Sequence, residues 1–105
     1  MKKYKVFRSF GNADRDIKKH ELVAVEYGDD IHAVTDRLME AVNDDASGLE
    51  KYRKHYTASS YAPEPVGRYR RVKRYAYIVT AVLSPAYGEV NDLIEYGVTE
   101  EPGEE

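Results

Sequence analysis

The feature that most constrains the fold is a pair of strand-like segments near the carboxyl end. Residues 68–83 form the longest run of this kind, and a turn-rich stretch, SPAYGEVN at 84–91, separates it from DLIEYGVTE at 92–100. Side chains of a strand alternate between two faces, so a hairpin must bring the apolar positions of both strands to one side. The register that does so pairs Leu83 with Asp92, Ala81 with Ile94, Val79 with Tyr96 and Tyr77 with Val98.

The same register, continued, brings a basic run to the acidic end of the chain. It pairs Tyr75 with Glu100, Arg74 with Glu101 and Arg71 with Glu104. Pro102 and Gly103 interrupt regular pairing, so we expect solvent-screened contacts of about 0–1 kcal/mol each. Residues 100–105 are therefore predicted to form an acidic, flexible tail.

A second hairpin is predicted at the amino end. KYKVFRSF at 3–10 and HELVAVEY at 20–27 both alternate apolar and polar residues, and the stretch between them is polar. Uniting their apolar faces pairs Val6 with Val23, Tyr4 with Val25 and Lys3 with Glu26.

Two helices are predicted between the hairpins. Asp29 or Asp30 caps the first, whose apolar positions recur at helical spacing: Ile31, Val34, Leu38, Ala41 and Val42. The spacing of Ser47 and Glu50 is that of a capping box, and it predicts a second, short helix with Leu49, Tyr52 and Tyr56 on one face. Residues 57–67, rich in Ser, Pro and Gly, are predicted to form a loop.

The sequence therefore predicts an α+β fold of order ββααββ, a four-stranded antiparallel sheet with two helices packed on one face. A chain of 105 residues fits one domain, which we assign to residues 1–105. No apolar run approaches the ~18 residues that span a bilayer, so no membrane contact is expected. The lysines of MKKYKVFRSF precede no apolar stretch, and the chain has no cysteine. We expect a mature, cytoplasmic protein without disulfides.

Nothing in the sequence indicates a catalytic or metal site. His20, His32 and His55 fall on different predicted elements, and no nucleotide-binding or hydrolase motif is present. Adjacent carboxylates ahead of helices are typical of helix caps. We expect no enzyme activity, no metal and no cofactor.

The basic run offers one candidate contact surface. The net charge is −3, yet residues 68–74 carry five basic side chains. Basic and aromatic residues together neutralise phosphates and stack on unpaired bases. The alternative prediction is thus a nucleic-acid-binding accessory protein that uses strand 68–77, with contacts from Arg68, Tyr69, Arg70, Arg71, Lys73 and Arg74.

The outer face of the second hairpin offers another. If the core positions face the helices, the side chains that face away form a patch without charge: Ile78, Thr80, Val82 and Leu93. Such a patch is typical of a protein contact, either with a second copy in a homodimer or with a different partner.

The stretch SGLEKYRKHYTASSYAPEPVGRYRRVKRYAYIVTAVL, the charge blocks and the compact size resemble small accessory proteins of phages and conjugative elements of Gram-positive bacteria, such as anti-restriction and anti-CRISPR proteins. The resemblance implies a non-enzymatic inhibitor of a host defence system, binding a protein or nucleoprotein. Acidic side chains would imitate phosphates on its surface: Asp29, Asp30, Asp44, Asp45 and Glu50. We therefore predict a small interaction protein with a protein or nucleoprotein partner.

Overall fold

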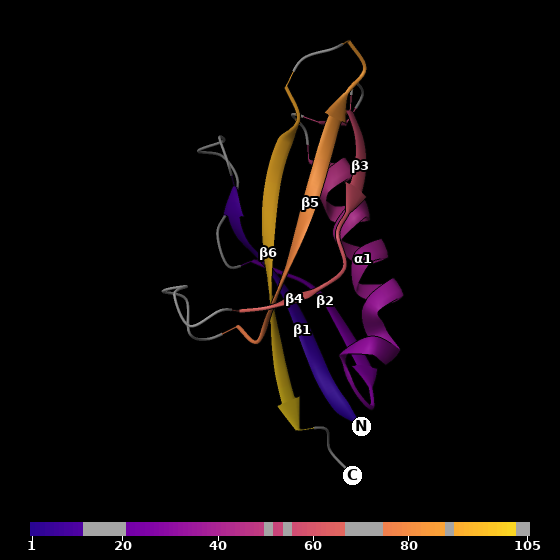
Figure 1. The fold of residues 1–105 in the computed structure, drawn as a ribbon, viewed down its shortest axis with the longest axis vertical. Helices are drawn as coiled ribbons and strands as arrows, with labels where there is room; N and C mark the ends of the chain where they lie inside the picture. Colours follow the sequence, from indigo (N-terminus) through magenta and orange to yellow (C-terminus); the bar gives the residue numbers. More distant parts are fainter. Residues whose placement is uncertain (12–20, 50–51, 54–55, 67–74, 88–89, 103–105) are drawn as a thin grey trace.

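The computed structural model describes residues 1–11, 21–49, 52–53, 56–66, 75–87 and 90–102. This part of the chain holds six strands and one helix (Figure 1). In chain order they are β1 (Lys2–Gly11), β2 (Glu21–Gly28), α1 (Ile31–Gly48), β3 (Tyr56–Ser60), β4 (Glu64–Pro65), β5 (Tyr77–Pro85) and β6 (Asp92–Pro102). No described helix is long and apolar enough to cross a membrane.

The strands form one antiparallel sheet in the order β2-β1-β6-β5-β3, with β4 paired to β5. Helix α1 packs against β2, β3 and β5. Because β2 and β3 lie at opposite edges, the sheet curls around the helix (Figure 1). The predicted four-stranded ββααββ sheet with two helices is therefore wrong.

The second predicted helix is absent from the described residues because the first helix is longer than expected. Ser47 lies in the last turn of α1, where its hydroxyl donates to the Asp44 carbonyl at 3.2 Å. The N–H of Leu49 closes the helix on the Ala46 carbonyl at 3.3 Å. Most of β3 and all of β4 lie in the stretch that was predicted to be a loop. Their pairing with β5 satisfies main-chain N–H and C=O groups that a loop would leave to water.

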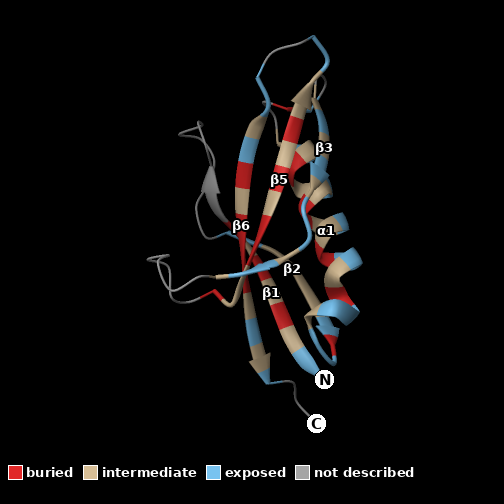
Figure 2. Cartoon of the chain, viewed as in Figure 1, coloured by how far each residue is buried: buried red, intermediate tan, exposed pale blue. Residues whose placement is uncertain are grey.

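The predicted register of the β5–β6 hairpin is confirmed. Leu83 pairs with Asp92, Ala81 with Ile94, Val79 with Tyr96 and Tyr77 with Val98. Buried and less buried positions alternate over residues 79–83 and 93–96, as one covered face requires, whereas Ile78 and Gly97 are also buried (Figure 2). The fully buried side chains of this face are Val79, Ala81, Leu83, Ile94, Tyr96 and Val98, and they meet Val34, Leu38, Val42 and Ala46 of α1.

The register predicted for the first hairpin is wrong by one residue. Val6 pairs with Ala24, Tyr4 with Glu26 and Lys3 with Tyr27. The register shifts between Val6 and Phe7, where a bulge leaves one extra residue on β2. The observed pairing turns Glu26 toward α1, where Arg37 meets it at 3.4 Å between Nη1 and Oε2.

The acidic end of β6 pairs with β1. Glu100 lies opposite Tyr4, and Glu101 lies opposite Lys3. The Lys2 ammonium approaches Glu100 at 3.5 Å, and the Lys5 ammonium approaches Glu101 at 3.4 Å. Strand β6 thus reaches Pro102; residues 103–105 of the predicted tail lie outside the described residues, as do Arg71 and Arg74.

Candidate functional site

The strongest polar cluster in the described chain is buried between the sheet and the helix. Arg8 of β1, only 8% exposed, binds both carboxylate oxygens of Asp45 on α1, through Nε to Oδ2 at 2.9 Å and Nη2 to Oδ1 at 2.6 Å. The Tyr96 hydroxyl of β6 donates to Asp45 Oδ2 at 2.6 Å. Arg8 Nη1 also meets Glu21 of β2 at 3.0 Å. The guanidinium therefore joins β1 and β2 to the helix, and the Asp45 carboxylate adds β6 through Tyr96.

The chemistry of this cluster favours a structural role. Burial, and then the hydrogen bond to Asp45, raise the pKa of Tyr96 well above its usual range. The hydrogen bond to Asp45 also raises the pKa of Arg8, although burial opposes it. Tyr96 therefore stays protonated and Arg8 stays charged at any physiological pH. Neither group is poised to exchange a proton.

Arg8 and Tyr96 were not among the predicted site residues, although the sequence held a signal for Arg8. Tyr4 and Val6 mark the core face of the first strand, and Arg8 is the next residue on that face. A charged side chain that falls on the buried face of an alternating strand requires a buried partner of opposite charge. Asp45, predicted as part of an acidic surface, is that partner.

The other predicted acidic residues do not form one surface. Asp30 caps α1, its carboxylate accepting from the Ala33 N–H at 2.9 Å, and Asp29 beside it is exposed. Asp44 lies near the opposite end of the helix, about 21 Å away at 1.5 Å per residue. Glu50 lies outside the described residues.

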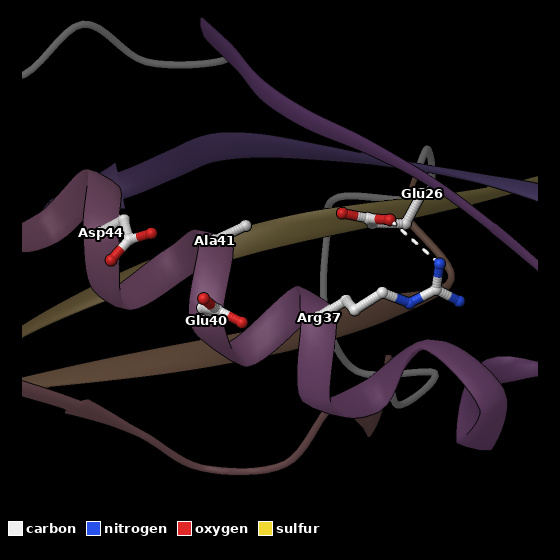
Figure 3. A pocket seen from close by; sticks show the side chains of 5 residues that line it. All are labelled: Glu26, Arg37, Glu40, Ala41 and Asp44. Atoms are coloured by element: carbon white, nitrogen blue, oxygen red, sulfur yellow. Dashed lines mark hydrogen bonds and ion pairs between the residues drawn. The ribbon is translucent and has the colours of Figure 1, made fainter.

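Asp44 instead lines an open hollow of about 280 Å³ along α1, with Glu26, Arg37, Glu40 and Ala41 (Figure 3). Figure 3 shows Arg37 turned toward Glu26 of β2, while Glu40 and Asp44 project from the helix. Arg37 also donates to the Tyr27 carbonyl at 2.9 Å. Within the described ranges, no three His, Asp or Glu side chains gather closely enough to hold a metal ion.

The predicted nucleic-acid contacts, Arg68, Tyr69, Arg70, Arg71, Lys73 and Arg74, all lie outside the described residues. The tyrosine that follows them is described, and it is not available for stacking on bases. Tyr75 is only 3% exposed and lies over Gly97 of β6. Its ring centroid is 5.9 Å from that of Phe7 on β1.

The predicted outer-face patch is divided by the structure. Ile78 is only 6% exposed and lies between Glu64 of β4 and Gly97 of β6 in the ladder. Thr80 and Val82 are half-buried, and Leu93 is 40% exposed. Val82 lies directly opposite Leu93 on one side and Ser59 of β3 on the other. We call these four open positions the outer-face patch: Ser59, Thr80, Val82 and Leu93.

No family model matches the sequence, and comparison with curated proteins and with solved structures found no match. The resemblance to accessory proteins of phages and conjugative elements therefore stays a prediction.

Proposed function

We propose that this chain is a non-enzymatic protein-binding module and that the outer-face patch contacts its partner. The observation that supports this proposal is the asymmetry of the sheet. Helix α1 covers one face, while Leu93 keeps 40% of its surface exposed on the other. Apolar surface left open in the middle of a sheet is stabilised when a protein partner covers it.

The composition of the patch favours a protein over a nucleic acid. Its four side chains carry hydroxyl or apolar groups, and their neighbour Glu95, opposite Thr80, is negative, whereas phosphate binding requires Lys or Arg. The centres of protein interfaces are depleted in charged residues in the same way.

The polar groups of the core support a role without catalysis. Arg8, Asp45 and Tyr96 bind one another, so no nucleophile or general base of this cluster is free. The hollow beside Arg37 is lined by carboxylates and one guanidinium already bound to Glu26 and to main-chain carbonyls. If the resemblance to phage accessory proteins holds, the partner is a host defence protein or nucleoprotein, and binding inhibits it.

Photo-crosslinking from defined positions in cells that carry the gene tests the proposal. A benzophenone amino acid at Leu93 reports on the outer-face patch, and one at Asp36, exposed on α1, is the matched control. We expect a nuclease-resistant protein adduct from Leu93 and none from Asp36. The adduct formed from position 93 should be lost when Val82 is replaced by Asp.

Three results would contradict the proposal: adducts of equal yield from both positions, an adduct indifferent to Val82→Asp, or capture that disappears after nuclease treatment. The last would favour nucleic-acid binding. Circular dichroism of each variant establishes that the fold survives.

A further inference from the structure

One edge of the sheet is β2, and the other is formed by β3 and the two-residue β4, which both pair with β5. An edge strand presents a row of main-chain donors and acceptors that can pair with another chain. Proteins commonly block such edges with charged side chains or a covering element. An additional strand can therefore bind only at an edge that is not blocked.

The β2 edge is blocked. Arg37 of α1 reaches over it, donating to the Tyr27 carbonyl at 2.9 Å and pairing with Glu26 at 3.4 Å. The strand also carries a second carboxylate, Glu21, which is half-exposed. A strand approaching this edge would have to displace the Arg37 guanidinium from the Tyr27 carbonyl and from Glu26.

The β3 edge is open in the described part of the chain. The Tyr61 N–H donates to the Thr80 carbonyl at 3.0 Å, so position 61 faces β5. Main-chain groups of an antiparallel strand alternate in direction, so positions 57 and 59 also face β5. The N–H and C=O groups of Tyr56, Ala58 and Ser60 therefore point away from the sheet, and no described segment pairs with them.

Nothing on β3 repels a second strand. Its sequence, YTASS, contains no charge and no proline. Helix α1 lies beneath the strand and not beside it, because the Ser60 hydroxyl reaches the Met39 carbonyl at 3.5 Å from the core side. Figure 1 shows β3 at the margin of the sheet with α1 behind it.

We propose that β3 pairs with β3 of a second copy of this chain, antiparallel and about a twofold axis at Ala58. This register sets Ala58 opposite its own copy and Tyr56 opposite Ser60. The outward-facing positions then meet one another, and each such pair exchanges two main-chain hydrogen bonds.

The strand is complementary to itself in this register. Thr57 lies opposite Ser59 of the second copy on the outer face, a pairing of hydroxyl groups that stabilises sheets. No charge meets a like charge in this pairing. The inference does not rest on the proposed function, because it uses the outward main-chain groups of Tyr56, Ala58 and Ser60, although Ser59 of the outer-face patch lies beside the new pairing.

Light scattering coupled to size-exclusion chromatography, over about a 100-fold range of concentration, tests the pairing, because the dimer fraction follows mass action. We expect a mass of twice 12.0 kDa at the upper end of the range. Ala58→Pro removes an outward N–H at an edge position where proline is tolerated, so this variant should be folded and monomeric.

Charge exchange tests the register itself. Thr57→Lys/Ser59→Lys sets lysine opposite lysine and Thr57→Glu/Ser59→Glu sets glutamate opposite glutamate, so each variant alone should be monomeric. An equimolar mixture of the two should recover the dimer mass. A monomeric unmodified chain throughout the range, or a dimer that survives both Ala58→Pro and the lysine pair, would overturn the proposal. If each charged variant is monomeric but their mixture gives no dimer, the twofold register at Ala58 is wrong.

Discussion

Tyr75 lies so close to Gly97 that a Cβ on residue 97 would overlap the tyrosine ring. The contact forms on the face of the sheet opposite α1, and the Phe7 ring is 5.9 Å from that of Tyr75 between centroids. Gly97 pairs with Phe7 on one side and Ile78 on the other. The missing side chain at position 97 thus provides the space in which a second, smaller cluster forms.

We expect Gly97→Ala to destabilise the protein by about 1–3 kcal/mol, because the new methyl group must displace the Tyr75 ring. The matched control is Gly48→Ala, where a Cβ would have nothing within 4 Å. That change should be neutral or slightly stabilising, since alanine favours the helix by roughly 0.5–1 kcal/mol. Urea denaturation followed by circular dichroism measures both. Equal stability of the two variants would show that Tyr75 does not occupy the space above Gly97.

Arg8→Met should cost about 3 kcal/mol, because it leaves the Asp45 carboxylate buried without its cation. The same substitution at Arg37, whose pair with Glu26 is half-exposed, should cost about 1 kcal/mol or less. Replacing Arg8→Met/Asp45→Leu/Tyr96→Phe together should recover much of the loss, since the buried groups are then apolar and the half-exposed Glu21 carboxylate is left to water. Thermal and urea unfolding of the three variants check this ordering. A similar loss at positions 8 and 37 would contradict it.

Stability should fall at alkaline pH because of Tyr96. Burial and the bond to Asp45 raise the pKa of Tyr96 in the folded state, whereas the unfolded chain ionises near the ordinary value of about 10. Above that pH the unfolded state binds fewer protons than the folded state, so the free energy of unfolding decreases as pH rises. The contribution of Tyr96 is fully present below pH ~10 and declines by about 1.4 kcal/mol per pH unit above it.

Tyr96→Phe removes this group, so the alkaline slope should become shallower even though the variant is less stable at neutral pH. Urea midpoints measured between neutral and strongly alkaline pH give the two slopes. Parallel slopes for the variant and the unmodified chain would show that Tyr96 ionises alike in both states.

The two glutamates at the end of β6 should differ in their contribution. Glu100 accepts from the buried Tyr4 hydroxyl at 2.8 Å, whereas Glu101 meets only the Lys5 ammonium among the described residues. Glu100→Ala should therefore cost about 1–2 kcal/mol and Glu101→Ala less than about 1 kcal/mol. Added salt should remove the effect at position 101 and leave most of that at position 100, because screening acts on exposed ion pairs. Denaturant titrations at low and high salt measure both; a loss of the same size and salt dependence at each position would be inconsistent with the structure.

The sequence predicted the β5–β6 register because both strands alternate and only one pairing unites their apolar residues. The β1–β2 register escaped prediction because the bulge after Val6 leaves no clear mark in the residue pattern. Leu49, Tyr52 and Tyr56 are spaced as on a helix, and the rings of Tyr52 and Tyr56 do meet, at 4.9 Å between centroids. They meet across a turn, because Tyr56 already belongs to a strand beside β5. The local sequence around Tyr56 permits either a helix or a strand, and pairing with β5 selects the strand.

For the candidate surfaces, the sequence indicated Val82 and Leu93 correctly as outward-facing, since the alternation fixes the face. It did not indicate that Ile78 would be covered, because burial there depends on β4 and on the absence of a side chain at Gly97. The sequence pattern also assigned Asp45 to the surface, although its carboxylate accepts hydrogen bonds from Arg8 between the sheet and the helix.

The position of β1 in the sheet has a consequence for how the chain is made. Lys2 pairs with Pro102, so β1 lies between β2 and β6, a strand that is synthesised after the other described strands. Until β6 emerges, β1 keeps one side unpaired and the core lacks Ile94, Tyr96 and Val98. Contacts between residues so distant in sequence form slowly, and exposed strand edges in a waiting chain promote aggregation. The nascent β1–β2 hairpin is therefore the part of this protein that most needs protection by a chaperone during synthesis.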